Sequence, residues 1–354
     1  MIDSGEIQRM IENALSQKKD KFVICPFGEN GIQTKYILNH CYGIKEEKII
    51  DNKFCKYNRE ILSVNDLREM DTTGWVILLN STFPGVNDLL EKAIREVKND
   101  ISIINIMEPL MVEDASKSDF YHELKKKTRT RKVLDYNLVR CGKMGDGGYI
   151  FVDDFSGVGK AYSFGIGNEI TWDMDIADKK IDVHMYDPTI ERFPAYNPYF
   201  HFHRIGLAGK DCKDSGYLSL ESILRENGDL NNKNLILKMD IEEFEWEVLE
   251  NTDEEILDNF LQMSFEFHKL LNAKNEKRVL EVFEKLGHTH QAIWVHANNM
   301  GYSAKVEDGI LPSLLEMTLV NRKVYRFSDE VIQYPMNLDY PNLAYRKEVI
   351  LGEW

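Results

Sequence analysis

The chain contains 354 residues, of which 43% are hydrophobic and 29% charged, a composition sufficient for two domains with ordinary hydrophobic cores. Its net charge of -15 at pH 7 argues against a nucleic-acid partner, because an acidic surface repels a polyanion. No apolar segment approaches the roughly 18 residues that cross a bilayer, so no membrane association is expected.

Over residues 1–110, short apolar runs alternate with helical patterns. Residues 21–28 (KFVICPFG) predict a buried strand, and residues 29–41 place apolar side chains at helical spacing. The later runs KIIDNK, WVILLNST and ISIINIM are rich in Ile and Val and lie far enough apart for crossover connections. The alternation predicts a small parallel sheet with helices on its faces, which resembles the Rossmann-like modules that precede some bacterial sugar-tailoring enzymes.

Two interpretations of this N-terminal module stay open. The stretch Phe27–Gly31 (FGENG) follows the first strand and Asp51 ends the next, an arrangement compatible with a nucleotide-type cleft for a nucleotide sugar. The glycines are few, however, which favours a structural or dimerising role. A homodimer is compatible with the second interpretation.

Residues 111–132 are charged and lose the periodicity, which predicts a charged linker or a bridging helix. Their basic run, Lys125–Lys132, is interpreted as solvated rather than phosphate-binding. Strand and helix patterns alternate again over residues 133–354. The strand candidates are Ala161–Ile166, Asp182–Asp187, His201–Gly206, Leu235–Ile241, Leu261–His268, Gln291–His296 and Ser313–Val320.

A glycine turn follows the first of these strands. Gly165 and Gly167 allow the backbone to approach a ligand closely, and we expect Asn168 to begin a helix whose free N–H groups could bind it. Asp187 ends the next strand at the offset at which a carboxylate receives ribose hydroxyls in nucleotide-binding βαβ units. Two purely structural interpretations remain. The glycines could serve only the backbone turn, and Asp187 could cap the turn before Pro188.

The most distinctive run is LILKMDIEEFEWEVLEN, which begins as a buried strand. Lys238, Asp240 and Glu242 lie on one face of its end, because side chains alternate along a strand. Charged groups are costly to bury unless they pair or face a cleft, and in a doubly wound sheet the cleft lies beyond the carboxyl ends of the strands. The run therefore predicts a polar cleft at this edge.

These features together resemble a class I S-adenosylmethionine-dependent methyltransferase of the FkbM-like group. The resemblance covers about residues 133 to 326 and also includes RCGKMGDGGYIFVDD, IWVHANN and LPSLLEMTLVNR. It implies a methyltransferase-type sheet in the C-terminal domain. Together with the N-terminal module, the expected fold is α/β with two Rossmann-like doubly wound domains. One position departs from the group, since Glu243 stands where glycine is more usual, which would crowd the start of the next helix.

The resemblance also implies a set of cofactor-binding residues. The glycine turn would line the methionine end of S-adenosylmethionine, the strand-end aspartate would hold the ribose, and the end of the third strand would lie near the adenine. The GDGGY stretch would contact the amino-acid portion, although it also fits a tight hairpin turn. These residues are Gly165, Gly167, Asn168, Asp187, Gly206, Leu207, Ala208, Asp146 and Tyr149.

The acceptor must lose a proton during methyl transfer to a hydroxyl, so a general base is expected. His268 is the preferred base, with a pKa near neutrality, and Glu266 shares its strand face. His296 could instead bind or deprotonate the acceptor, with Asp240 as a further catalytic candidate. A divalent metal held by Asp240, Glu242, Glu266 and His268 is compatible with the spacing but not required by it.

The predicted function is an O-methyltransferase that acts on a hydroxyl of a saccharide or glycan precursor. The alternatives are an oxidoreductase that binds NAD(P) or a nucleotide sugar, and a cofactor-binding protein without turnover. The five cysteines are odd in number and form no CxxC pair, and the N-terminus lacks the apolar core of a signal peptide. We therefore expect a cytoplasmic protein without disulfides.

Overall fold

The computed structural model describes residues 4–83, 85–191, 193 and 195–354, and its chain forms two compact units. The first unit comprises Met1–Val112 together with Asn299–Ser303 and Leu343–Glu348, and the remaining residues form the second. The two late segments were not anticipated from the sequence. Within the first unit Arg346, only 1% exposed, holds one of them in place through an ion pair with Glu6 at 2.8 Å.

The first unit contains a five-stranded parallel sheet in the order β3-β2-β1-β4-β5. Alternate side chains of β1 face opposite sides, so Phe22 and Ile24 pack with α1 and α2, whereas Val23 and Cys25 pack on the side of α3. The elements are α1 (Ser4–Ser16), β1 (Lys21–Cys25), α2 (Glu29–Cys41), β2 (Lys48–Ile50), β3 (Ile61–Leu62), β4 (Trp75–Leu79), α3 (Val86–Val97) and β5 (Ser102–Asn105).

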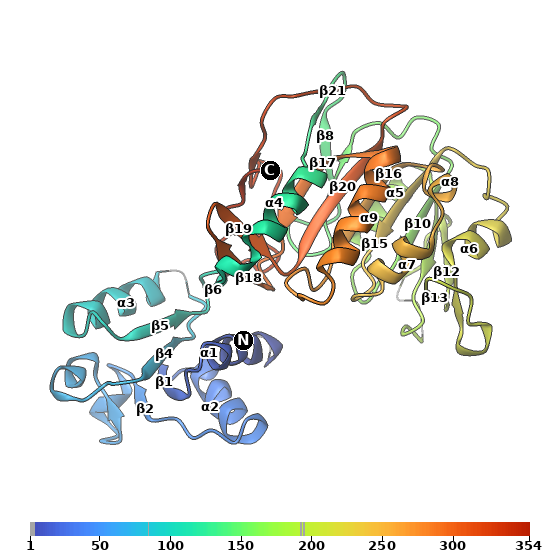
Figure 1. Cartoon of the computed structure of the whole chain (residues 1–354). Coiled ribbons are helices and arrows are strands. Elements are labelled where there is room, and N and C mark those ends of the chain that lie inside the picture. The colour runs from blue at the N-terminus through green and yellow to red at the C-terminus, as the bar shows by residue number, and fades with distance from the viewer. Residues whose placement is uncertain (1–3, 84, 192, 194) are drawn as a thin grey trace. The chain divides into compact units, whose positions relative to one another are not determined.

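The second unit is built on a seven-stranded sheet in the order β12-β11-β10-β15-β16-β20-β17 (Figure 1). The chain runs outward from β10 in one direction and from β15 in the other, so the topological switch point lies between these two central strands. The strands are β10 (Lys160–Phe164), β11 (Asp182–Tyr186), β12 (Phe200–His203), β15 (Leu235–Met239), β16 (Phe260–Phe267), β17 (His290–Ala297) and β20 (Leu315–Asn321).

The expected α/β fold with a doubly wound sheet is confirmed for this unit. Each strand candidate from the sequence lies on one of the seven strands, and all side chains of β15 are buried, as its apolar run indicated. The direction of β20 was not predicted: it pairs antiparallel with both β16 and β17. The helices between the strands are α5 (Thr171–Asp178), α6 (Leu220–Glu226), α7 (Glu245–Asn251), α8 (Glu254–Leu257) and α9 (Glu276–Thr289).

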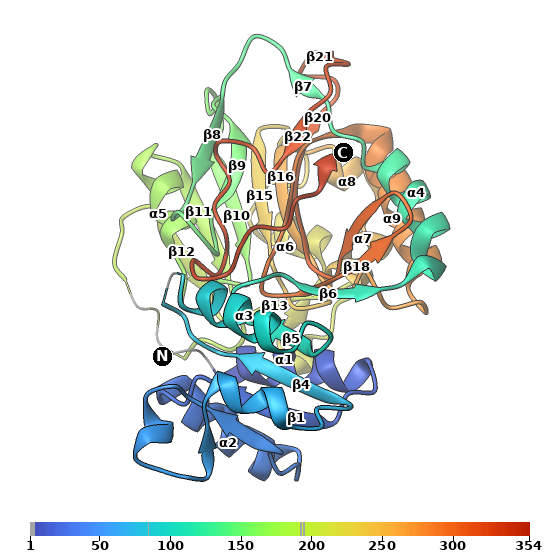
Figure 2. The ribbon, with the colours of Figure 1, turned by 90° about the vertical axis from the view of Figure 1, so that its left-hand side faces the viewer.

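The segment expected as a charged linker or a bridging helix contains a helix. Residues 111–132 contain most of β6 (Leu110–Glu113) and all of α4 (Ser118–Lys127), which packs beside α9 in both views (Figures 1 and 2). The helix forms because Phe120, Tyr121 and Leu124 bury one face, while Lys127 pairs with Glu284 at 2.7 Å.

None of the described helices is long and apolar enough to cross a membrane.

Short strands complete the second part of the chain. The short strands are β7 (Lys132–Val133), β8 (Leu138–Cys141), β9 (Tyr149–Val152), β13 (Gly206–Leu207), β14 (Tyr217–Leu218), β18 (Tyr302–Val306), β19 (Gly309–Pro312), β21 (Phe327–Ser328), β22 (Gln333–Tyr334) and β23 (Gly352–Glu353).

Candidate active site

A cavity of about 460 Å³ opens at the carboxyl ends of β10, β11 and β15, at the switch point of the second sheet. A larger cavity of about 530 Å³ in the first unit lies at the amino ends of β1, β4 and β5, the edge at which doubly wound sheets do not bind ligands. The residues that line the first cavity are Asp146, Gly147, Gly165, Ile166, Gly167, Asn168, Glu169, Tyr186, Asp187, Pro188, Thr189, Gly206, Leu207, Tyr217, Lys238, Asp240, Ile241, Glu242 and Phe244.

The glycine turn after β10 packs against the end of β15. Gly165 has a φ of +72°, and a Cβ there would lie 1.5 Å from the carbonyl oxygen of Asp240. The buried Lys238 donates to the Gly165 carbonyl at 2.7 Å and so ties the two strand ends together. Gly167 differs, because no atom lies within 4 Å of its Cβ position. Gly165 is therefore required by packing, whereas Gly167 leaves open space in the cavity wall.

The helix after this turn begins later than expected. Asn168 lies in the turn and lines the cavity, but α5 begins at Thr171. The reason is local: Gly167 has a left-handed φ of +53°, which a right-handed helix does not accept, and the Glu169 side chain accepts a hydrogen bond from the Thr171 N–H at 2.9 Å.

Asp187 holds the glycine turn in addition to facing the cavity. Its Oδ2 accepts hydrogen bonds from the N–H groups of Ile166 and Gly167 at 3.0 and 2.9 Å, and its Oδ1 accepts two from Thr189. Burial raises the pKa of Asp187, but these hydrogen bonds outweigh it and hold the pKa below its usual value. The carboxylate is thus ionised and its roughly four lone-pair sites are occupied, so ribose hydroxyls would compete with Thr189.

Asp51 stands in the same relationship to the first unit. It follows β2, as Asp187 follows β11, and accepts a hydrogen bond from the N–H of Phe27 in the turn after β1 at 2.9 Å. The strand-end aspartates that the sequence suggested as ligand-binding groups therefore both hold a turn, and any ligand-binding role for Asp51 stays a prediction.

The flat wall of the cavity comes from residues that sequence reasoning missed. Tyr217 lies so close to Gly206 that a Cβ on this glycine would come within 2.3 Å of the tyrosine ring. The Tyr217 ring stacks on Phe244, with 6.3 Å between ring centroids. Leu207 adds apolar surface, whereas Ala208 does not line the cavity. No local pattern marks Tyr217, because its place depends on the pairing of two short strands, β13 and β14.

The GDGGY stretch belongs both to a hairpin and to the cavity wall. Strands β8 and β9 pair antiparallel on either side of it, as the hairpin interpretation required. Asp146 nevertheless lines the cavity, and burial followed by the charge of Glu316 raises its pKa. Tyr149 is fully buried and does not line the cavity, and its hydroxyl has no hydrogen-bond partner among the residues that the structure describes.

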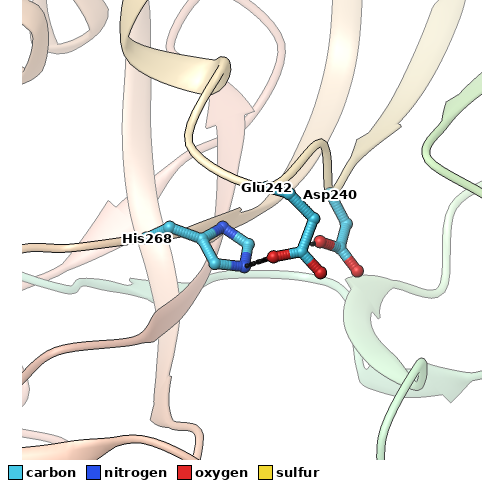
Figure 3. A group of neighbouring side chains, drawn as sticks. All are labelled: Asp240, Glu242 and His268. Carbon is cyan, nitrogen blue, oxygen red and sulfur yellow. Dashed lines mark ion pairs between the residues drawn. The ribbon is translucent and has the colours of Figure 1, made fainter.

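Beside the cavity, His268 lies among acidic side chains (Figure 3). Its Nε2 is 3.3 Å from a Glu242 oxygen, 3.8 Å from one of Glu266 and 3.9 Å from one of Asp240. Its Nδ1 is 2.9 Å from Oε1 of the buried Glu245, a residue that sequence reasoning missed. The structure thus brings the predicted residues Asp240, Glu266 and His268 together, although His268 does not line the cavity.

The protonation states of this cluster differ from the expectation. Burial alone lowers the pKa of His268, but the hydrogen bond and charge of Glu245, with Asp240 and Glu242, raise it to about 9. The pKa of His268 is therefore higher than the near-neutral value expected from the sequence. Burial raises the pKa of Asp240 to about 6, partly offset by Lys238 and His268.

Glu266 also belongs to a second group of acidic side chains. One oxygen each from Asp146, Glu266 and Glu316 lie within 4.8 Å of one another. His296 faces this group rather than the cavity, since its Nδ1 is 3.0 Å from a Glu316 oxygen and its side chain is buried. Asn298 donates to Glu266 at 2.9 Å. Glu316 was missed, although a lone glutamate inside the apolar run LLEMTLV was a usable signal.

The residues at the departure from the group pattern adopt left-handed backbone. Glu242 has a φ of +52° and Glu243 of +83°, a conformation that favours glycine and is costly for other residues. Glu242 faces His268, whereas Glu243 forms an ion pair with Lys269. The turn before α7 is thus part of the site rather than an obstruction to it.

No family model matches this chain. It is similar to the probable methyltransferase-like protein 24 of Homo sapiens and of Rattus norvegicus, with 31% identity over 120 residues in each case. The match covers 31% of this chain and 32% of each relative, so the chain spans about a third of the length of these curated relatives.

A solved structure, the crystal structure of methyltransferase FkbM from Methylobacillus flagellatus KT, aligns with a TM-score of 0.47 and 14% identity, over 89% of this chain and 95% of that one. The resemblance to methyltransferases drawn from the residues is confirmed by the matches in sequence.

Proposed function

We propose that the second unit is an S-adenosylmethionine-dependent O-methyltransferase whose acceptor is a hydroxyl of a saccharide or glycan precursor. One observation carries the proposal: the cavity at the switch point joins the glycine turn, a flat aromatic wall and an acidic cluster within one space. The similarity to the methyltransferase-like relatives supports the reaction class, and the site chemistry supports the choice of cofactor and acceptor.

The residues fit an adenosine-type cofactor with a positively charged sulfur. Tyr217 and Phe244 offer flat apolar surface for the adenine, and the open space at Gly167 admits a ligand beside the turn. Asp240 places a carboxylate in the same cavity, where it would attract a sulfonium. The bound cofactor would supply an electrophilic methyl group, and every other requirement falls on the protein.

The protein must orient the acceptor and accept its proton. Asp240 is the better candidate for the base, because it lines the cavity whereas His268 lies behind it with both ring nitrogens facing carboxylates. His268 then acts as a positioning residue that holds Asp240 and Glu242 in place. Asp146, Asp240 and Glu242 give the cavity several hydrogen-bond acceptors, which suits a polyhydroxylated acceptor.

The test is isothermal titration of the full chain with S-adenosylmethionine, with its demethylated product and with NAD. We expect micromolar binding of the first two ligands and none of NAD. Affinity for NAD alone would favour an oxidoreductase and overturn the proposal. Incubation with a radiolabelled methyl donor and a panel of saccharides should then give methylated product, and binding without product from any acceptor would favour a non-catalytic protein.

A further inference from the structure

We propose that Asp240, Glu242 and His268 (Figure 3) bind a divalent first-row transition-metal cation. Glu266 lies in reach as a fourth ligand. One ligand atom from each of the three residues lies within 4.8 Å of the others. Cation binding itself goes beyond the proposed methyl transfer and can be measured without it.

The orientation of His268 is that of a metal-ligating imidazole. Ligating histidines almost always donate their second ring N–H to a carboxylate or carbonyl, which fixes the ring and leaves the other nitrogen for the metal. Here Nδ1 lies 2.9 Å from Glu245, which is itself fully buried and accepts a hydrogen bond from the Ile241 N–H at 3.1 Å. Nε2 consequently faces the oxygens of Asp240 and Glu242.

The charge around the site is unbalanced. Glu266 is buried, and the acidic residues Asp240, Glu316, Asp146 and Glu242 all act on it electrostatically. Within the described part of the chain, the cations beside Asp240 are Lys238, which is bonded to the Gly165 carbonyl, and His268 itself. A cation with two charges would offset this excess of carboxylates.

The Tyr149 hydroxyl is an independent observation that points to a ligand. It is fully buried, has no hydrogen-bond partner among the described residues, and lies near Asp240 and Glu266, whose charges act on it. A buried hydroxyl without a partner costs about 1–3 kcal/mol, so such groups normally have one. A water bound to the cation would supply it.

One imidazole with two or three carboxylates suits Mn²⁺, Fe²⁺ or Zn²⁺ better than Ca²⁺, which prefers oxygen ligands alone. Because Asp240 and Glu242 also line the cavity, the cation would lie where an acceptor hydroxyl must bind. Its role in orienting that hydroxyl rests on the proposed function, whereas the existence of the site does not.

Glu242 and Glu243 provide a matched pair for the test. They are neighbours with left-handed backbone and exposed side chains, but only Glu242 faces His268. After treatment with a chelator, the full chain would be titrated with Mn²⁺ at pH 7.5 and free Mn²⁺ followed by electron paramagnetic resonance. We expect saturable binding that Glu242→Gln weakens at least about tenfold and Glu243→Gln leaves unchanged.

Two further measurements sharpen the result. His268→Gln should weaken Mn²⁺ binding as Glu242→Gln does, and if this buried variant fails to fold, the exposed Glu242 variant still decides. Ca²⁺ at equal concentration should not displace Mn²⁺, because the imidazole favours the transition metal.

Absence of saturable Mn²⁺ binding, equal effects of the two glutamate variants, or ready displacement by Ca²⁺ would each overturn the proposal. Titration of the same samples with S-adenosylmethionine separates its failure from that of the proposed function, since cofactor binding should persist without Mn²⁺.

Discussion

The Asp187 carboxylate accepts a hydrogen bond from the Gly167 N–H at 2.9 Å, so one side chain both shapes the glycine turn and faces the cavity. Stability of the turn and affinity for a cofactor are therefore linked at this position. A variant without the Asp187 carboxylate should lose stability as well as affinity, because the buried Ile166 N–H also loses its hydrogen-bond acceptor.

Asp187→Ala should abolish binding of S-adenosylmethionine and lower the free energy of unfolding by about 1–3 kcal/mol, since N–H groups lose their acceptor. Calorimetric titration and chemical denaturation measure the two effects. Asp51→Ala is the matched control, because Asp51 holds the corresponding turn of the first unit. It should reduce stability without changing affinity; unchanged affinity in the Asp187 variant would remove this residue from the cofactor site.

The two glycines of the turn should respond differently to alanine. Gly165→Ala places a Cβ against the Asp240 carbonyl and should prevent the native packing of β10 on β15. Gly167→Ala meets no atom and should cost only about 1–2 kcal/mol for its left-handed backbone, while weakening cofactor binding. Denaturation curves and titration of both variants test this; equal stabilities would contradict the geometry.

Asp240→Asn should lower the rate of methyl transfer by about 10²–10⁴-fold, the usual contribution of a positioned general base, while the variant still binds S-adenosylmethionine. Glu243→Gln serves as the control, because its side chain points away to Lys269. The comparison requires single-turnover rates with a labelled methyl donor. A rate in the Asp240 variant equal to that of the unchanged chain would assign the base elsewhere.

His290 should make stability depend on pH. Burial lowers its pKa to about 4, although the Phe260 carbonyl that its Nε2 contacts at 2.9 Å works in the opposite direction. In the unfolded chain the histidine pKa is about 6.5, so between about pH 6.5 and pH 4 the unfolded chain binds a proton that the folded chain does not bind. The contribution of neutral His290 to the free energy of unfolding is therefore fully present above about pH 6.5. It is lost as the pH falls toward 4, and the loss is at most about 3 kcal/mol.

His290→Gln removes this titration and keeps a donor for the Phe260 carbonyl. Denaturation of the unchanged chain and the variant from pH 7 to pH 4 should show the unchanged chain losing more stability over that interval. Parallel pH profiles would show that His290 is not held neutral in the folded state.

Local sequence was sufficient for the strands and for the turn between them. The apolar run at β15 predicts a buried central strand in an α/β protein. Gly165 follows β10 because no other residue permits the close approach to Asp240. Asp240, Glu266 and His268 could be foreseen as one group for the same reason, since the carboxyl ends of neighbouring parallel strands meet at one edge.

Other features depend on contacts between residues far apart in the chain, which no local pattern encodes. Tyr217 reaches the cavity only because β13 and β14 pair, and Glu316 joins the acidic group only because β20 runs antiparallel between β16 and β17. The pKa of His268 depends on such contacts most clearly. Its residue type was evident from the sequence, but its pKa was decided by Glu245, which the turn through Glu242 and Glu243 places at its Nδ1.

The sequence by itself therefore determined which strands form the second sheet and which of its edges carries polar side chains, because burial and side-chain alternation are local properties. The tertiary structure alone decided which groups face each other across that edge and how each is protonated. Electrostatic energy depends on distances of a few ångströms, and these distances are set by packing of the whole unit.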